Sequence, residues 1–359
     1  MNSGNRRIES VVLLDFVRSI FSVTGSKRQE ADILAQHLID SNLVGHDSHG
    51  IIRVSKYLEW LRLDMVRSNR HARITMESES IIAVTGDFGY GQVIATEAVD
   101  LAIEKASNNG VMVLAIKDCG HLGRIGAWAE LVANQGMASI HFVNTSGFGI
   151  LVAPFGGSDR RLSANPIAAG VPVKGGEPII LDIATSMIAE GKIQEARNQG
   201  IELPEGCVID GNGLPTQDSE AFYGVPLGTI LPFGGHKGFG LSFICEVLAG
   251  SLTGGRSSHP ENPTAGRLVN NMLSVVFDPE CFVEKDTFAE DVSRLTTWVK
   301  SSPPSKEGGE VLLPGEPERQ IRSERLSNGI PLSVETCLQL QKAAIAVGVP
   351  DTEAAFLGG

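Results

Sequence analysis

Residues 111–143 read VMVLAIKDCGHLGRIGAWAELVANQGMASIHFV, and this stretch decides the fold. The apolar runs Val111–Ile116 and Ala138–Val143 are typical of buried strands. Between them, a glycine-rich turn leads into a helical pattern over about 122–135. A strand, a helix and a second strand in this order predict an α/β fold, in which helices cover a sheet.

The segments on either side extend this pattern and then change it. Upstream, Ile81–Val84 predicts another strand, and residues 92–108 predict a helix. Apolar residues at helical spacing indicate that the first 70 residues are mostly helical, and the last 30 residues have the same pattern. Between 144 and 240 the chain is rich in glycine and proline, and long irregular stretches of a compact protein often carry function.

Composition limits the class of protein. The 359 residues are enough for two domains, and a content of 42% hydrophobic and 20% charged residues is typical of a soluble globular protein. The formal charge of −12 argues against nucleic acid or an anionic membrane surface as the main partner. The start lacks a signal-peptide pattern, and no apolar run approaches the ~18 residues of a membrane span. A cytoplasmic protein is expected.

One polar stretch is suited to a small acid substrate: Asp47-Ser48-His49-Gly50-Ile51-Ile52-Arg53. A helix that begins near Ser48 would place His49, Arg53 and Tyr57 on one face. Arginine can hold a carboxylate through two parallel hydrogen bonds, and histidine can exchange a proton with a neighbouring oxygen. The stretch therefore fits a 2-oxo or 2-hydroxy acid. The alternative is an ordinary solvated helix face.

Three further motifs have site character. The Gly120–Gly126 turn carries His121 and Arg124 at a predicted helix start, where free N–H groups favour an anion. The Gly234–Gly240 turn carries His236 and Lys237, which suit phosphate or ribose oxygens. Asp182 ends an apolar run, where it can orient a histidine, bind a ribose hydroxyl or cap a helix. Each motif also has a purely structural interpretation as a turn or a cap.

Two common site types lack their signatures. No Gly-x-Gly-x-x-Gly fingerprint is present, so a dinucleotide would bind without the Rossmann motif. The five cysteines are scattered without a Cys-x-x-Cys pair, which predicts neither a disulfide framework nor a zinc site. A metal-dependent hydrolase or lyase that uses His46, Asp47 and His49 is the alternative from another class. Because no second cluster supplies further ligands, no metal is expected.

Taken together, these segments resemble the type-2 malate/L-lactate dehydrogenase family, also called the L-sulfolactate dehydrogenase-like family. The matching pieces follow the family's order over nearly the whole chain: Asp47–Gly50 with Arg53, Gly120–Gly126, Asn165-Pro166, Leu181–Ser186, His236–Gly238 and Leu313–Glu316. The resemblance implies an NAD(P)-dependent oxidoreductase and a homodimer. It also implies a non-Rossmann, three-layer mixed-sheet cofactor domain over 76–317, and an all-helical, substrate-side domain from 1–75 with 318–359.

The resemblance also assigns roles to residues. It implies His121 and His49 as acid/base groups, with His121 favoured, Arg53 as the carboxylate clamp, and Asp182 as support for the histidine or the nicotinamide ribose. Ser48 completes the expected catalytic set. The expected NAD-binding positions are His49, Gly123, Arg124, Ile125, Thr145, Ile180, Leu181, Asp182, Ile183, Ala184, His236, Lys237, Asn270, Gly315, Glu316, Pro317 and Glu318.

The substrate stays open at this point. The expected reaction is reversible hydride transfer between NAD, or NADP, and a 2-hydroxy/2-oxo carboxylic acid. The same family also supports reduction of a cyclic imino acid or of a sugar-derived keto acid. Residues 162–166 read Leu-Ser-Ala-Asn-Pro where Gly-Thr-Asn-Pro is commoner in the family, and this departure lies near the expected pocket.

Overall fold

A seven-stranded mixed sheet forms the centre of the computed structural model, which describes residues 6–264, 266–284, 286–306 and 308–358. In spatial order its strands are β2 (Arg73–Glu77), β3 (Ile81–Thr85), β4 (Val111–Cys119), β11 (Leu268–Phe277), β5 (Ala138–Gly147), β6 (Ile167–Val171) and β7 (Ile179–Ile183). Only β3 and β4 run parallel; the other neighbouring pairs are antiparallel. The predicted α/β class and the three predicted strands are confirmed.

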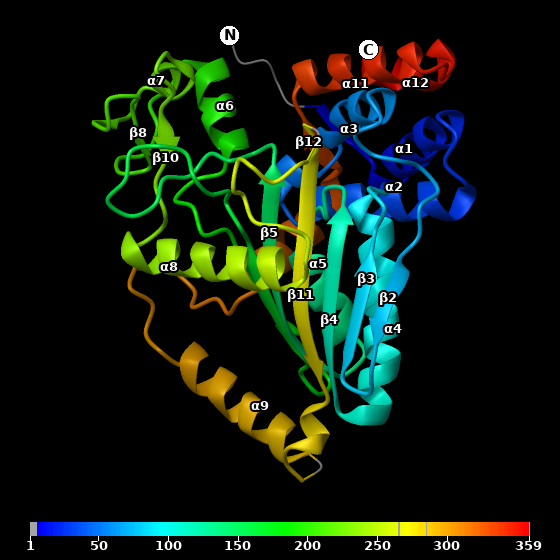
Figure 1. Cartoon of the computed structure of the whole chain (residues 1–359), viewed down its shortest axis with the longest axis vertical. Coiled ribbons are helices and arrows are strands. Elements are labelled where there is room, and N and C mark those ends of the chain that lie inside the picture. The colour runs from blue at the N-terminus through cyan, green and yellow to red at the C-terminus, as the bar shows by residue number, and fades with distance from the viewer. Residues whose placement is uncertain (1–5, 265, 285, 307, 359) are drawn as a thin grey trace.

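Helices cover this sheet because successive strand residues face opposite sides. Met112, Leu114 and Ile116 of β4 are fully buried in one apolar cluster with α4 (Gly91–Asn109) and α5 (Gly126–Ala133). On β5, Val143 belongs to that cluster, whereas the next residue, Asn144, bonds to Glu246. Glu246 begins a π-helical turn (Glu246–Leu252) that continues α8 (His236–Cys245). In Figure 1, α8 lies in front of the sheet and α5 lies behind it.

The two chain ends fold together beside one end of the sheet (Figure 1). Strands β1 (Arg6–Ile8) and β12 (Ile330–Leu332) pair antiparallel. One apolar cluster combines α1 (Ser10–Val23), α2 (Arg28–Leu43) and α3 (Arg53–Arg62) with α11 (Val334–Ala346) and α12 (Asp351–Gly358). Helix α10 (Glu316–Asn328) contacts α2. The mostly helical character of both ends is confirmed, while the division into two domains stays a prediction.

The glycine- and proline-rich region contains a small lobe of its own. It consists of α6 (Glu190–Gln199), α7 (Ser219–Tyr223) and a three-stranded sheet of β8 (Val208–Ile209), β9 (Pro215–Thr216) and β10 (Thr229–Ile230). A separate apolar cluster that includes Ile193, Leu203 and Phe222 holds it together. Helix α9 (Thr287–Lys300) has no buried residue and lies apart from the other helices in Figure 1. In the part of the chain that the structure describes, no helix is long and apolar enough to cross a bilayer.

Two predicted helix starts are wrong. Residues Asp47–His49 form a 3-10 turn, and α3 begins only at Arg53, because Gly50 is extended with φ −90° and ψ −151°. Helix α5 begins at Gly126 rather than near 122, since Gly123 has φ +74° and cannot continue a helix. Both departures lie in the segments that carry the predicted catalytic histidines.

Candidate active site

The two predicted catalytic histidines lie face to face. His49 comes from the 3-10 turn after α2, and His121 comes from the loop after β4. Their ring centroids are 5.4 Å apart and the ring planes differ by 16°. Both residues are partly exposed, although their rings are largely desolvated.

A buried tyrosine lies behind His121. The Tyr57 hydroxyl is 2.7 Å from Nδ1 of His121, and Nε2 of Gln92 donates to the same hydroxyl at 2.7 Å. Tyr57 is 1% exposed, and burial raises the pKa of its hydroxyl to about 12. Because Nδ1 of His121 is occupied by Tyr57, Nε2 is the ring atom left for a substrate.

Arg53 and Ser48 border the histidine pair. Nε of Arg53 donates to the backbone oxygen of Ser48 at 2.5 Å, and Oγ of Ser48 lies 3.0 Å from Nδ1 of His49. Among the described residues, the two terminal nitrogens of Arg53 have no hydrogen-bond or ion-pair partner. A fixed guanidinium with two free nitrogens suits the two oxygens of a carboxylate. The prediction that His49, Arg53 and Tyr57 share one helix face is wrong for His49, which precedes the helix.

Burial and a nearby positive charge disfavour the protonated form of both histidines. Burial and then the positive charge of Arg53 hold the pKa of His49 and of His121 well below the usual value of 6.5. An anion bound at Arg53 would offset that charge and raise both pKa values again. We therefore expect the binding of an anion at Arg53 to favour the uptake of a proton.

The loop that carries His121 is held by side chains from distant elements. The N–H of Leu122 donates to Oδ1 of Asn270 at 2.9 Å, and the N–H of Arg124 donates to Nε2 of His37 at 2.9 Å. Asn270 also donates to Oγ1 of Thr145 at 2.8 Å. A Cβ at Gly123 would lie 2.1 Å from Nε2 of His37, so this close approach requires glycine. These bonds place His121 against α3 and α4.

A second cluster brings three predicted cofactor segments together. Oδ2 of Asp182 accepts from the N–H of Gly126 at 2.9 Å and lies 3.9 Å from Nδ1 of His46. His46 also lies 3.6 Å from Oε1 of Glu318. The N–H of Ile180 donates to the oxygen of Pro314 at 3.1 Å. These contacts bring together the ends of three predicted cofactor segments, 123–125, 180–184 and 315–318.

The two carboxylates of this cluster differ in character. Burial raises the pKa of Asp182, whereas the hydrogen bond from His46 lowers the pKa of Glu318. On β7, Leu181 and Ile183 are partly exposed, and Ala184 is exposed. Pro317 is exposed in the first turn of α10. This surface is therefore accessible at apolar positions beside two carboxylates.

The turn before α8 adjoins the end of β7. The N–H of Phe233 donates to the oxygen of Thr185 at 3.0 Å. Gly234 and Gly235 have φ of 56° and 64°, which brings His236 and Lys237 to the first turn of the helix. Both side chains are exposed, and the ring of His236 meets Phe155 edge-on at 5.8 Å. Free N–H groups, a histidine and a lysine at a helix start are suited to phosphate oxygens.

Two predicted cofactor residues have side chains with other partners. Arg124 is 2% exposed and pairs with Glu130 at 2.5 Å. Glu316 pairs with Lys300 at 2.6 Å and accepts from the N–H of Leu313. Contact of these two positions with a cofactor would involve the backbone or a rearranged side chain, and their binding role stays a prediction.

Sequence reasoning missed several buried residues around the site. Gln92 has no motif around it, and His37 has no context that separates a site from a scaffold. Glu246 is 4% exposed and accepts from Asn165 at 2.7 Å and from Asn144 at 3.1 Å. The only signals for this network were the polar turns at Asn165-Pro166 and at Asn144, which could line a cleft or merely connect strands.

The residues of the alternative metal site do not form one. Among the described residues, no group of three or more His, Cys, Asp or Glu side chains is placed to hold a metal ion. Both oxygens of Asp47 accept from Arg325, at 2.6 and 2.9 Å. The carboxylate of the predicted ligand set is thus already neutralised.

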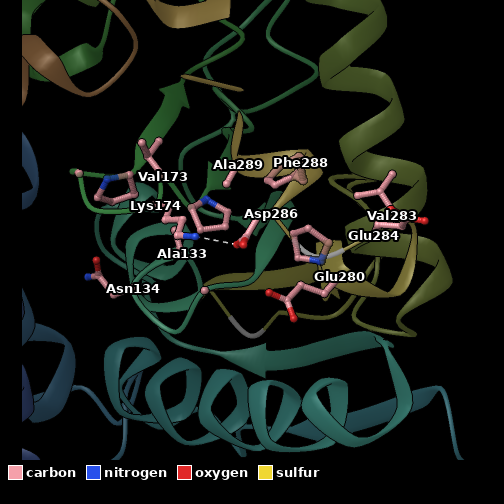
Figure 2. A pocket seen from close by; sticks show the side chains of 15 residues that line it. Ala133, Asn134, Val173, Lys174, Glu280, Val283, Glu284, Asp286, Phe288 and Ala289 are labelled. Carbon is pink, nitrogen blue, oxygen red and sulfur yellow. Dashed lines mark hydrogen bonds and ion pairs between the residues drawn. The ribbon is translucent and has the colours of Figure 1, made fainter. Parts of the chain in front are cut away.

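Two cavities lie away from the histidine pair. One, of about 600 Å³, lies where α5, the turn between β6 and β7, and the start of α9 meet, and Lys174 pairs with Asp286 in it (Figure 2). The other, of about 550 Å³, is bordered by Phe155, Pro232 and Gly235. The second cavity therefore adjoins the His236 turn.

Comparison with known proteins identifies the family. The family model described as malate/L-lactate dehydrogenase matches residues 8–341. The chain belongs to this family. Among members of the malate/L-lactate dehydrogenase family, hydroxycarboxylate dehydrogenase B of Escherichia coli K12 is 40% identical over 353 residues, which cover 98% of this chain and 97% of that protein.

Solved structures of similar proteins agree in fold over nearly the whole chain. Sulfolactate dehydrogenase from Methanocaldococcus jannaschii superposes with a TM-score of 0.87 at 33% identity, covering 97% of this chain and 99% of that one. The delta1-piperideine-2-carboxylate reductase from Pseudomonas syringae pvar. tomato superposes with a TM-score of 0.82 at 33% identity, covering 94% of this chain and 99% of that one. The family resemblance predicted from the motifs is confirmed.

Proposed function

We propose that this protein is an NAD(P)-dependent oxidoreductase that transfers a hydride reversibly between nicotinamide and C2 of a 2-hydroxy/2-oxo carboxylic acid. The observation that carries the proposal is the stacked, partly exposed pair of His49 and His121 beside Arg53, whose terminal nitrogens are free among the described residues. Hydroxycarboxylate, lactate, malate and sulfolactate dehydrogenases among its relatives support this substrate class.

In the proposed reaction, Arg53 holds the carboxylate of the acid. The C2 oxygen of the acid would then meet Nε2 of His121, since Nδ1 of that ring is bonded to Tyr57. During oxidation Nε2 accepts the proton of the C2 hydroxyl, and during reduction it returns a proton to the C2 oxygen. A positioned acid/base of this kind contributes roughly 10²–10⁴-fold to the rate. Ser48 orients His49, which borders the same space.

The residues present fit a nicotinamide dinucleotide. The His236-Lys237 turn has donors for phosphate oxygens, and Asp182 and Glu318 have acceptors for ribose hydroxyls. Thr145 and Asn270 lie beneath the loop of His121, next to the reaction site. When bound, the nicotinamide supplies or accepts the hydride. NAD is the expected cofactor; the donor set does not exclude NADP.

We further propose that cofactor binding here is non-Rossmann, in a three-layer domain over 76–317 beside a helical, substrate-side domain from both chain ends. The missing glycine fingerprint and a sheet with one parallel pair support this view. A cytoplasmic homodimer is part of the same proposal, without nucleic acid or membrane as partner. The support for the dimer is the exposed apolar residues on α8 and α9, such as Phe243, Ile244 and Trp298.

A second candidate is reduction of a cyclic imino acid. The structural likeness to the piperideine-2-carboxylate reductase supports it. Reduction of a sugar-derived keto acid is a third candidate. A screen of NADH and NADPH oxidation against 2-oxo acids, sugar-derived keto acids and cyclic imines separates these substrates. Activity on no substrate with either cofactor, or activity that depends on a bound metal and is abolished by a chelator, would contradict the proposal.

A further inference from the structure

Gln92 is a buried amide with one unsatisfied end. It is the second residue of α4 and is 0% exposed. Its Nε2 donates to the Tyr57 hydroxyl at 2.7 Å, while its Oε1 is buried and has no hydrogen-bond partner among the described residues. A buried acceptor without a partner is unfavourable, and such exceptions call for a functional or structural reason.

Gly91, the residue before Gln92, lies against the backbone of the His121 loop. A Cβ at Gly91 would lie 2.4 Å from the oxygen of His121 and 2.5 Å from the oxygen of Gly120. The start of α4 is therefore packed directly against the backbone of the His121 loop. A half turn of the Gln92 amide about its last side-chain bond would exchange the positions of Nε2 and Oε1.

The single proton of the Tyr57 hydroxyl links the orientation of Gln92 to His121. When the hydroxyl donates to Nδ1 of His121, it can only accept from Gln92, and His121 carries its proton on Nε2. When Nδ1 of His121 is protonated, the hydroxyl accepts from it and must donate to Gln92, which requires Oε1 at that position. The first arrangement leaves Oε1 of Gln92 unpartnered, as found; the second pairs Oε1 with the Tyr57 hydroxyl and moves Nε2 to the position without a partner.

We propose that Gln92 is a positioning residue whose amide reverses as His121 changes from its resting form to its reactive forms. This inference rests on the proposed function, in which Nε2 of His121 exchanges the proton. As a base, His121 needs an empty Nε2 and therefore a proton on Nδ1; as an acid, it carries both protons. Both reactive forms have a proton on Nδ1, so both require the reversed amide of Gln92.

The surroundings of His121 provide the trigger for this change. The groups that face it are Arg53 and Tyr57 from α3, His49 from the 3-10 turn, His37 from α2 and Gln92 from α4. Arg53 is the positive charge among them, and it disfavours a protonated ring. A substrate carboxylate on Arg53 offsets this charge and favours protonation of His121. The high pKa of Tyr57, about 12, keeps the proton on its oxygen.

Two variants at one position separate the contributions of the amide. Gln92→Met keeps the volume but removes both polar atoms, so kcat should fall about tenfold in both directions, with KM for the acid within about twofold. Gln92→Glu offers only acceptors when ionised, so it should shift the acid limb of the pH profile of kcat/KM upward by about one pH unit. Ser107→Ala, at the exposed end of the same helix, is the matched control and should change neither value.

Nitrogen NMR of histidine-labelled wild-type protein tests the inference without turnover. The resting enzyme should show His121 protonated on Nε2, and addition of oxamate, a non-reducible analogue of a 2-oxo acid, should protonate Nδ1; the signal is assigned with His121→Asn. An unchanged tautomer in the oxamate complex would overturn the inference, as would a Gln92→Met enzyme with the wild-type kcat and pH profile. Failure of the proposed function is a different result: a wild-type protein that oxidises neither NADH nor NADPH with any acid or imine.

Discussion

The Tyr57 hydroxyl lies 2.7 Å from Nδ1 of His121, although the two residues are 64 positions apart in the chain. Tyr57 is fixed on α3 by the helical core of the chain ends, and His121 is fixed on its loop by Asn270 and His37. The contact therefore joins the helical part to the sheet. It also determines which ring nitrogen of His121 faces the substrate.

Removing this hydroxyl should lower the rate rather than the affinity. In Tyr57→Phe, Nδ1 of His121 loses the acceptor that stabilises its protonated, reactive forms, and we expect kcat to fall about tenfold with KM for the acid little changed. Steady-state kinetics in both directions measure this effect. Tyr223→Phe is the matched control, since the Tyr223 hydroxyl is buried without a hydrogen-bond partner in the part of the chain described. Equal kinetics of Tyr57→Phe and wild type would remove Tyr57 from the mechanism.

Arg53 should govern affinity for the carboxylate. A charge-assisted hydrogen bond contributes roughly 1.5–3 kcal/mol, so Arg53→Ala should raise KM for the acid by about 10–100-fold. Arg53→Lys should recover only part of this loss, because an ammonium group cannot offer two parallel donors. Arg62→Ala, exposed at the end of the same helix, should leave KM unchanged. If kcat/KM of Arg53→Ala stayed at the wild-type value for every acid, the clamp would be wrongly assigned.

Anion binding should take up a proton. Arg53 and burial hold the pKa of His121 well below 6.5 in the free enzyme, and a carboxylate on Arg53 raises it, so the complex binds more protons than the free enzyme. Binding should thus weaken as pH rises from the free pKa to the pKa in the complex, by up to about tenfold per pH unit. Calorimetry with oxamate in two buffers of different ionisation enthalpy counts the protons. Uptake of no proton at any pH contradicts this coupling.

A buried histidine outside the site should limit stability in acid. His141 is fully buried between Ser139 and Ser274, and burial lowers its pKa to about 3. The unfolded chain protonates this residue near pH 6.5, so its contribution is complete above that pH and is lost as pH falls toward 3, by about 1.4 kcal/mol per unit. His141→Gln should therefore reduce the loss of unfolding free energy between about pH 7 and pH 5 by about 2 kcal/mol. Denaturant titrations at both pH values measure this, and an unchanged loss would show that His141 titrates normally.

Local patterns predicted the elements better than their arrangement. The apolar runs at 81–84, 111–116 and 138–143 are strands because alternate residues face a helical layer, which is a local property. Strand β11, by contrast, is inserted between β4 and β5, and Asn270 pairs with Cys119. Such pairing depends on contacts over about 150 residues, which no local pattern encodes. The boundaries near His49 and His121 were missed because side chains of other elements, rather than helical partners, bind the backbone there.

The site was predictable as motifs but not as a geometry. His49, Arg53 and His121 each had a chemical signal in the sequence, and two of them were grouped for the wrong reason, as one helix face. The stacking of His49 on His121, and the contacts of Gln92 with Tyr57, arise only when α3, α4 and the loop after β4 pack together. A buried glutamine in an ordinary helix has no local mark of function.

Transfer of a labelled hydride tests the central claim most directly. The purified protein is incubated with NADH or NADPH carrying deuterium at the transferable C4 position and with a panel of 2-oxo acids and cyclic imines, and the products are analysed by mass spectrometry. We predict deuterium on C2 of a 2-hydroxy acid, with the transfer greatly slowed in His121→Asn. Product without deuterium at C2, or no product from any 2-oxo acid, would contradict the proposed function.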